Sequence, residues 1–290
     1  MAGHSAALIS TDELALRLGA PAVRVFDCTT YLKPGPDGRY IAESGRANYD
    51  KGHVPGAAFL DLGAELSDTA SKLRFTLPPP KTLAKSFAGK GIGHGVHAVL
   101  YSHASPVWAT RIWWMLRAVG FDEASILDGG LDKWKGENRP LSTEETKFPP
   151  ATLSLRARPG LFVDKDDMKD AIGKADVLSL NALSREQHAG SGGMAYGRAG
   201  RIAGSSCVPA ASLFGPDKAL KPIAELRAAF DAVGAGQDKD KRILCYCGGG
   251  IAATLDAFVL TAVLGQRNVA VYDNSMQEWA NDPALPMEAG

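Results

Sequence analysis

Short apolar runs separated by helical patterns follow one another along most of the chain. Residues 22–27, 97–102 and 242–246 are rich in β-branched and aliphatic side chains, as buried strands are. Residues 108–120 place apolar side chains at helical spacing, and a capping sequence predicts a shorter helix that ends at Gly19. Strands that alternate with helices predict an α/β fold with a mainly parallel sheet.

Turns and shorter elements complete this pattern in the first part of the chain. Residues 34–38 form a turn-rich loop, and residues 52–56 form a turn bracketed by glycine and proline. We expect a helix over residues 83–89 and a strand followed by a turn over residues 125–134. These elements account for one complete domain before residue 141.

The same order of elements returns after a proline-rich, charged segment. Residues 142–159 contain two adjacent prolines and show no strong period, which is typical of a linker. We therefore expect one domain over residues 1–141 and a second over residues 160–290. Three motifs recur and indicate a tandem duplication: residues 52–56 match 200–204, residues 99–103 match 243–247, and residues 128–134 match 273–279, at shifts of 144 to 148 residues.

Length and composition fit a two-domain globular protein. The 290 residues include 45% hydrophobic residues, and 32 basic side chains balance 32 acidic ones, so nothing predicts binding to nucleic acid or to an anionic membrane. No run is long enough to span a bilayer and the N-terminus has no targeting pattern, so we expect a cytoplasmic protein. The four cysteines are too scattered for a disulfide framework, and we expect them to be reduced. No pattern indicates an oligomeric state.

The main candidate for chemistry lies where the strand over residues 242–246 ends. Cys247 comes next, and it is followed by Gly248, Gly249, Gly250, Ile251 and Ala252, after which a helical pattern begins. Glycines free the backbone, so successive N–H groups can turn towards one point and meet the positive end of the helix. A thiolate at Cys247 would be stabilised there, which makes it a candidate nucleophile.

The copy of this loop in the first domain lacks the same chemistry. His103 stands where the second domain has Cys247, and residues 104–106 replace the glycines. Pro106 has no N–H to donate, so we predict a first domain that supports the structure without a nucleophile of its own. Cys245 shares a face with Cys247 but lies inside the strand. We interpret Cys245 as a core residue, with a resolving thiol as the alternative.

The motifs together resemble the two-domain rhodanese family of sulfurtransferases over essentially the whole chain. Residues 52–57, G-H-V-P-G-A, are similar to the family's G-H-I-P-G-A turn, and residues 127–134 to its L-D-G-G…W motif. Residues 272–279, Y-D-N-S-M-Q-E-W, are similar to its second-domain closing motif, and residues 247–253, C-G-G-G-I-A-A, resemble its C-G-S-G-V-T-A loop. The resemblance implies tandem rhodanese-like domains, a cleft between them, and a nucleophile in the C-terminal copy.

The resemblance also implies a reaction. Cys247 would take the outer sulfur of a small anionic donor as a persulfide and pass it to cyanide or to an acceptor thiol, by ping-pong kinetics and with no metal or organic cofactor. The N–H groups from Gly248 to Ala252 would hold the negative sulfur. Thiosulfate is the expected donor, because sulfite leaves without needing a proton, whereas the enolate from 3-mercaptopyruvate needs one. 3-Mercaptopyruvate is the alternative donor.

Several departures from the family bear on the donor. Thiosulfate-preferring members usually have basic residues after the cysteine, where this chain has Gly248 and Gly249. Mercaptopyruvate-preferring members usually have a serine at the position of Gly249 and a histidine at the position of Phe75. Neither the basic residues nor the proton relay of the family is therefore in its usual place.

Two family arginines are also absent from their expected places in the second domain. The family's D-A-R and R-[FY]-x-G segments correspond to residues 181–183, Asn-Ala-Leu, and 187–190, Gln-His-Ala-Gly. Arg198 and Arg201 are the candidates to replace them, since guanidinium groups suit sulfonate or carboxylate oxygens. Solvated loop charges are the alternative for both. His188 is expected either to line the cleft or to lie exposed on a loop.

Other functions that use a loop of this kind fit less well. Rhodanese-like phosphatases place an arginine six positions after the cysteine, where this chain has Ala253. A nucleotide phosphate loop needs a lysine and a hydroxyl that the glycine run lacks, and Cys245 and Cys247 have no second ligand pair for zinc. A persulfide carrier loaded by a partner protein stays open as a non-enzymatic alternative.

Overall fold

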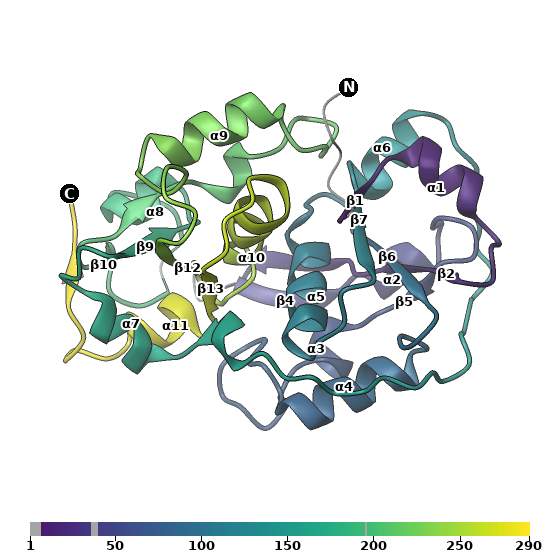
Figure 1. Ribbon diagram of the computed structural model, residues 1–290, viewed down its shortest axis with the longest axis horizontal. Helices are drawn as coiled ribbons and strands as arrows, with labels where there is room; N and C mark the ends of the chain where they lie inside the picture. The colour runs from purple at the N-terminus through teal and green to yellow at the C-terminus, as the bar shows by residue number, and fades with distance from the viewer. Residues whose placement is uncertain (1–6, 36–39, 195) are drawn as a thin grey trace.

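Two five-stranded sheets, one in each half of the chain, form the frame of the molecule (Figure 1). The computed structural model describes residues 7–35, 40–194 and 196–290. Neighbouring strands are parallel in both sheets. The fold is therefore the α/β class that the alternating pattern predicts.

The N-terminal half runs from β1 to α6. Its sheet has the order β1-β7-β6-β2-β5, and a separate antiparallel hairpin consists of β3 and β4. The strands are β1 Leu8–Ile9, β2 Val23–Asp27, β3 Thr30–Pro34, β4 Tyr40–Ser44, β5 Ala58–Phe59, β6 His97–Tyr101 and β7 Ala124–Leu127. The helices are α1 Thr11–Arg17, α2 Arg46–Tyr49, α3 Leu62–Glu65, α4 Pro80–Gly89, α5 Val107–Ala118 and α6 Gly130–Gly136.

The C-terminal half runs from η1 to β14. Its sheet has the order β11-β9-β12-β13-β8, and β10 pairs with β14. The strands are β8 Phe162–Val163, β9 Val177–Asn181, β10 Arg201–Ile202, β11 Ser206–Cys207, β12 Arg242–Tyr246, β13 Val269–Tyr272 and β14 Met287–Glu288. The helices are η1 Pro159–Leu161, α7 Lys165–Ala171, α8 Arg185–Ala189, η2 Ala210–Ser212, α9 Ile223–Asp231, α10 Ala253–Phe258, the π-helical turn η3 Val259–Val263, and α11 Ser275–Trp279.

The internal repeat is visible in the strand order. Read from its other edge, the second sheet has the order β8-β13-β12-β9-β11, which matches β1-β7-β6-β2-β5 strand for strand. The hydroxyls of Thr110 and Thr254, which the repeat aligns, lie 3.0 Å apart where α5 meets α10. Equivalent residues meet in this way when two copies are related by a two-fold axis. The halves are thus a duplicated unit packed on itself.

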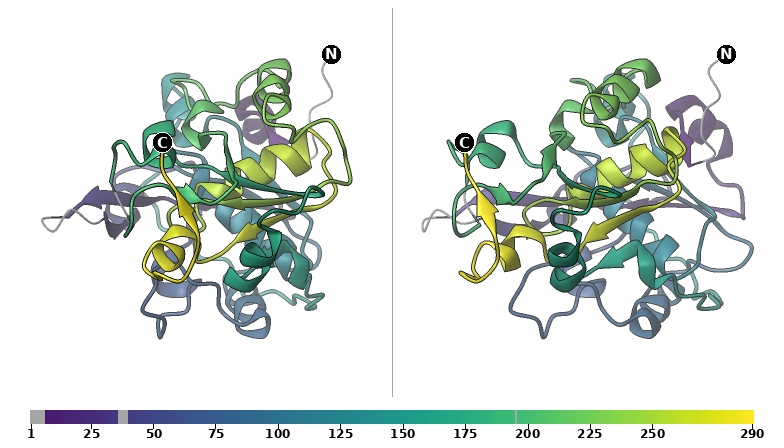
Figure 2. Two further views of the ribbon diagram at one scale, coloured as in Figure 1. Left: turned by 90° about the vertical axis from the view of Figure 1, so that its left-hand side faces the viewer. Right: turned by 60° about the vertical axis from the view of Figure 1, so that its left-hand side comes forward.

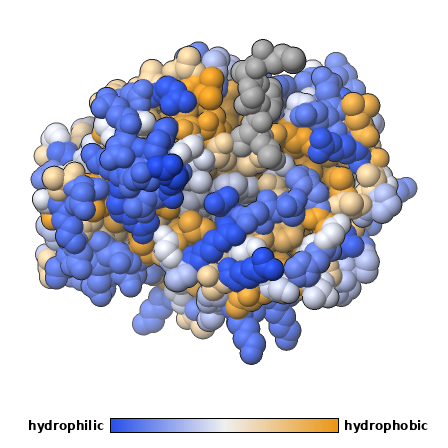
Figure 3. Space-filling view, viewed as in Figure 1, coloured by the Kyte–Doolittle hydropathy of each residue, from blue (hydrophilic) through white to orange (hydrophobic). Residues whose placement is uncertain are grey.

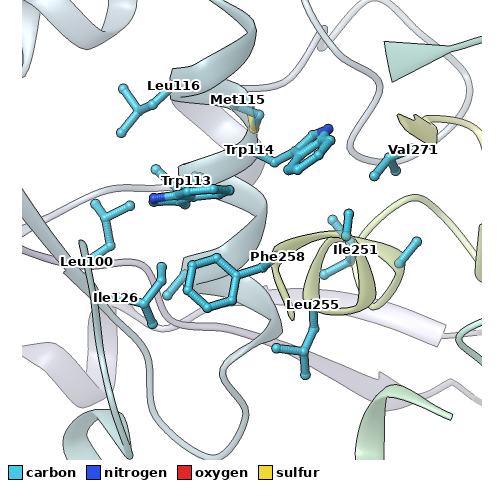
Figure 4. Close-up of a cluster of buried hydrophobic side chains, with 14 of the residues drawn as sticks. Leu100, Trp113, Trp114, Met115, Leu116, Ile126, Ile251, Leu255, Phe258 and Val271 are labelled. Carbon is cyan, nitrogen blue, oxygen red and sulfur yellow. The ribbon is translucent and has the colours of Figure 1, made fainter. Parts of the chain in front are cut away.

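The largest hydrophobic cluster passes between the halves instead of staying within one of them. Trp113 of α5 and Phe258 of α10 point towards each other, with ring centroids 4.9 Å apart in an edge-on arrangement (Figure 4). Both helices are buried on nearly all sides, which explains why apolar residues surround them instead of following one face. Each half also has a smaller buried cluster of its own, so the halves keep separate cores and share the largest one.

The structure contains elements that the sequence-based expectation did not include. The hairpin of β3 and β4 was not predicted, and it extends beyond the sheets as a purple ribbon in Figure 2. Residues 36–38 of the expected loop lie outside the described residues. Helix α6 follows directly on the expected turn at Gly129. The predicted linker is extended and follows the N-terminal half, where the Ala151 and Arg156 N–H groups donate to the carbonyls of Ala88 and Val119.

Hydrophilic residues dominate the face of the molecule shown in Figure 3, with hydrophobic residues in separate areas among them. None of the helices that the structure describes combines the length and the apolar composition needed to cross a membrane.

Candidate active site

Cys247 lies directly after β12, the central strand of the second sheet. Strands β9 and β13 pair with β12 on its two sides, so the cysteine stands at the carboxyl end of a parallel sheet, where ligands of α/β folds usually bind. It is 2% exposed and lines a pocket of about 90 Å³. Cys245 is fully buried within the strand, in agreement with its interpretation as a core residue, and burial raises the pKa of its thiol.

One hydroxyl holds the loop after Cys247 in place. Ser275 Oγ accepts hydrogen bonds from the N–H groups of Cys247 and Gly250, both at 3.1 Å, and donates to the carbonyl of Tyr272 at 2.7 Å. The loop carbonyls are held by the same segment, since Met276 N–H donates to the Cys247 carbonyl at 3.0 Å. The start of α11 therefore acts as a template on which the loop is shaped.

The backbone N–H groups that α11 does not bind belong to loop residues that line the pocket. Within the part of the chain that the structure describes, the N–H groups of Gly248, Gly249, Ile251 and Ala252 have no acceptor, and these four residues line the pocket. Gly250 does not line it. The expectation that Gly250 contributes to donor binding is corrected by its contacts, because its N–H is bonded to Ser275 and its carbonyl accepts from Arg111.

Two loop glycines are required by their neighbours. A Cβ on Gly248 would lie 1.9 Å from Cζ of Tyr196 and 2.2 Å from its hydroxyl oxygen, so the phenol ring fills the space of a side chain at this position. Gly250 has a φ of +72°, and a Cβ there would lie 2.2 Å from the Asp273 carbonyl oxygen. The glycine run therefore allows close packing as well as backbone curvature.

The pocket wall comes from both halves of the chain. The N-terminal half contributes Leu32, Arg74, Phe75, Val107 and Trp108, and the C-terminal half adds Leu183, Tyr196 and Gln277 to the loop residues. Among the described residues that line the pocket, Arg74 carries the only charged side chain. Most of the wall is apolar, and the loop amides and the Arg74 guanidinium provide positive potential. Such a pocket suits a small anion with an apolar part.

An ion pair between Arg111 and Asp273 connects the parts of the pocket wall that come from the two halves of the chain. Arg111 of α5 is fully buried, and its guanidinium donates to Asp273 Oδ1 at 2.6 Å, to the Phe75 carbonyl at 2.8 Å and to the Gly250 carbonyl at 3.1 Å. Asp273 Oδ2 accepts from Leu77 N–H at 2.7 Å. Arg111 thus ties the loop after Cys247 to the pocket wall of the other half.

The segment around Phe75 is held in an unusual conformation by these contacts. Phe75 has a φ of 60°, which costs about 1 kcal/mol or more for a residue with a side chain. Its carbonyl is bonded to Arg111, and its ring packs edge-on against Trp108 with centroids 5.6 Å apart. Gln277 bonds both backbone groups of the preceding Arg74. These bonds compensate for the strain and place Arg74 at the pocket.

Comparison with known proteins decides the family. The model of the rhodanese-like domain matches residues 10–137 and again residues 164–282. The chain belongs to the rhodanese family. A probable 3-mercaptopyruvate sulfurtransferase of Pseudomonas aeruginosa is 30% identical over 99% of both chains, and the 3-mercaptopyruvate sulfurtransferase of Escherichia coli is 32% identical over 97% of both chains. The crystal structure of SseA from Escherichia coli, described as a 3-mercaptopyruvate sulfotransferase, matches with a TM-score of 0.80 and 29% identity, covering 93% of this chain and 98% of SseA.

In the first rhodanese domain, side chains of the same domain accept hydrogen bonds from the N–H groups of the loop that corresponds to the one after Cys247. His103, at the position of Cys247, donates its backbone N–H to Thr29 Oγ1 at 3.0 Å, and Ala104 N–H donates to Asp132 Oδ2 at 2.7 Å. Asp132 Oδ1 lies 3.7 Å from His103 Nε2. The Asp132 carboxylate thus occupies the Ala104 N–H group, which could otherwise donate to a bound anion. That the first domain works as a scaffold stays a prediction.

Three residues expected at the rhodanese active site do not reach the pocket. Arg198 donates to the carbonyls of Trp279, Ala280, Asp282 and Leu285, and it lines a neighbouring pocket that shares Leu183 and Tyr196 with the pocket of Cys247. Arg201 donates to the Gly290 carbonyl and pairs with Glu288 at 3.3 Å. His188 lies 3.2 Å from the Asn181 amide, and burial, with Arg201 and Arg185, lowers its pKa to about 4. None of the three therefore enters the proposed donor site.

The candidate functional residues that sequence reasoning did not single out are Arg74, Arg111, Tyr196, Ser275 and Gln277. Ser275 stands in a recognised family motif, which was the one available signal for it. Within the described residues, no three His, Cys, Asp or Glu side chains are grouped as the ligands of a metal would be.

Proposed function

We propose that this sulfurtransferase of the rhodanese family takes sulfur from 3-mercaptopyruvate onto Cys247 and passes it to a thiol. The observation that carries the proposal is Cys247 itself, in a pocket lined by Arg74 and by four loop residues whose amides have no acceptor among the described residues. The names of the Pseudomonas aeruginosa and Escherichia coli relatives support 3-mercaptopyruvate as the donor. We therefore propose 3-mercaptopyruvate as the donor in place of thiosulfate, which the sequence had led us to expect.

The reaction follows from the positions of these groups. The Cys247 thiolate attacks the donor sulfur, the carbon–sulfur bond breaks, and its electron pair leaves with the pyruvate enolate. The loop amides at Gly248, Gly249, Ile251 and Ala252 stabilise the negative charge on the sulfur. The enolate gains a proton to become pyruvate, and the persulfide on Cys247 loses one. An acceptor thiolate then takes the outer sulfur and restores the cysteine, which gives ping-pong kinetics.

The pocket favours a monoanionic donor over a dianionic one. Thiosulfate would bring two negative charges into a space with one cationic side chain, Arg74, and largely apolar walls. 3-Mercaptopyruvate brings one carboxylate, which the guanidinium of Arg74 can bind through two N–H groups. Arg74 also donates to the Tyr40 carbonyl, and a guanidinium has five N–H donors, so donors remain for the substrate.

Intact mass measurements test the choice of donor. The purified protein is exposed to 3-mercaptopyruvate or to thiosulfate, weighed, and then treated with cyanide. We expect 3-mercaptopyruvate to add one sulfur atom per chain, which cyanide removes as thiocyanate, and to do so faster than thiosulfate. If thiosulfate transferred sulfur to the protein faster, the choice of 3-mercaptopyruvate as the donor would be wrong. Loading by neither donor would overturn the proposed reaction and favour a carrier that another protein loads.

Replacing Arg74 by alanine should weaken donor binding. A hydrogen-bonded pair of charges contributes about 1.5–3 kcal/mol, so we expect KM for 3-mercaptopyruvate to rise about 10- to 100-fold with a smaller change in kcat. Arg74→Lys should recover part of this loss, because the charge stays and the two-pronged geometry does not.

The matched control for Arg74 is Lys72→Ala. Lys72 is an exposed cation in the same segment, and it does not line the pocket. Steady-state kinetics should show a near-normal KM for this variant. Equal increases in KM for the Lys72 and Arg74 variants would mean that the general charge of the segment matters and that Arg74 does not bind the carboxylate.

A further inference from the structure

Tyr196 lies against the loop that follows Cys247. Its phenol end is so close to Gly248 that no side chain fits between them, and its ring lines the same pocket as Cys247. The segment is anchored at this point, since Asn281 Nδ2 donates to the Tyr196 carbonyl at 2.7 Å and to the Gln277 carbonyl at 2.9 Å. The backbone at Tyr196 is therefore held by Asn281, which lies just after α11, the helix that shapes the loop.

The hydroxyl of Tyr196 is available to a bound molecule. It has no hydrogen-bond partner among the residues that the structure describes, and of the described residues that line the pocket only Tyr196 carries a hydroxyl. The side chain of Gln277 is committed to the backbone of Arg74 through both its amide atoms. Burial, followed by the charge of Cys247, raises the pKa of Tyr196 well above its usual range, so the phenol keeps its proton and stays a donor.

We propose that the Tyr196 hydroxyl donates a hydrogen bond to the carbonyl oxygen of 3-mercaptopyruvate and stabilises the enolate that leaves when Cys247 takes the sulfur. This inference rests on the proposed function. As the carbon–sulfur bond breaks, its electron pair moves through the methylene carbon onto the carbonyl oxygen, so negative charge develops at the atom that Tyr196 binds. The enolate then takes a proton at carbon, the persulfide loses one, and the overall step needs no oxidant or reductant.

The arrangement explains how the site works with Gly249 and Phe75 in place of the serine and histidine that mercaptopyruvate-preferring members usually carry. Gly248 leaves room for a ring that comes from another segment, and that ring brings a hydroxyl to the pocket. Arg74 binds the carboxylate from the other half of the chain. The donor is then held at its carboxylate and at its carbonyl oxygen, with its sulfur directed to Cys247.

Separating the two half-reactions tests the role of Tyr196. In rapid-quench experiments with 3-mercaptopyruvate, we expect Tyr196→Phe to form the Cys247 persulfide about 10²-fold more slowly, as the loss of one hydrogen bond to a developing oxyanion does elsewhere. Once the variant is fully loaded by long incubation, discharge by cyanide should run at the normal rate, because no carbonyl oxygen takes part in that step. The phenylalanine keeps the ring, so the unfolding temperature should not change.

The control is Tyr40→Phe, which removes the hydroxyl from the neighbouring ring, 6.0 Å away between centroids. Tyr40 does not line the pocket, so we expect normal loading. A Tyr196→Phe variant that loads as fast as the unmodified protein would overturn the inference, and so would one in which loading and discharge slow equally, since that result indicates a structural role. If the unmodified protein fails to load from 3-mercaptopyruvate, the proposed function fails instead.

Discussion

Replacing Cys247 by serine should reduce sulfur uptake from 3-mercaptopyruvate to the background level, a loss of at least about 10³-fold. The hydroxyl of serine does not ionise near neutral pH, and none of the described residues lining the pocket is a histidine that could take its proton. The substitution changes one atom in a side chain that is 2% exposed, so the fold should remain. Intact mass after exposure to the donor, followed by cyanide treatment, measures the effect directly.

Cys207→Ser is the matched control. Cys207 is buried, donates to the Leu183 carbonyl at 3.4 Å, and has its pKa raised to about 11 by burial. Its thiol is therefore protonated at neutral pH, and we expect normal loading when it is replaced. Sulfur that still loads onto the Cys247→Ser variant, and that cyanide still removes, would place the nucleophile at another cysteine.

The chemical centre of the site could be predicted from local sequence because its parts are adjacent along the chain. A strand, a cysteine and a glycine run are neighbours, and the repeat shows that the copy at His103 has the strand but lacks the cysteine and the glycines. The structure adds which amides are available: those of Gly248, Gly249, Ile251 and Ala252, without that of Gly250. This detail could not be predicted, because it depends on a hydroxyl at Ser275.

The groups around the cysteine could not be predicted because they come from distant segments without a regular pattern. Arg74 precedes a residue with an unusual backbone conformation, and Tyr196 follows a glycine-rich stretch. Arg198 was chosen because it flanks a turn, yet its guanidinium is used by four backbone carbonyls. Proximity in sequence indicates which residues can reach a site, but the hydrogen-bond partners decide which of them do.

The fold was predictable where burial imposes a pattern and less so at the surface. The strands β6 and β12 and the helix α5 are buried and apolar, and they lie close to the expected ranges. The hairpin of β3 and β4 is largely exposed, so its residues carry no strict alternation of polar and apolar positions. The tryptophans of α5 favoured a place in the core and at the domain interface, but α10 could not be identified as the partner, because an apolar helix does not reveal which surface it packs against.

Replacing Arg111 by methionine should destabilise the protein by about 3–5 kcal/mol, because Asp273 then stays buried without its partner. Arg111 is fully buried and Asp273 is 13% exposed, so water cannot easily replace the lost bond. The carbonyls of Phe75 and Gly250 also lose their donor. Urea unfolding measures the stability. The control is Arg158→Ala, whose bond to Asp122 is exposed and should contribute no more than about 1 kcal/mol.

A second substitution separates the charge of this pair from its role at the active loop. With Asp273→Asn added to Arg111→Met, no unpaired carboxylate is buried, so we expect part of the stability to return. Sulfur uptake should stay low, because Gly250 and Phe75 still have no guanidinium to bind and the loop after Cys247 is no longer fixed to the wall that carries Arg74. Recovery of uptake together with stability would show that Arg111 only balances Asp273. Stability without uptake would show that the two halves of the duplicated chain form one active site through this side chain.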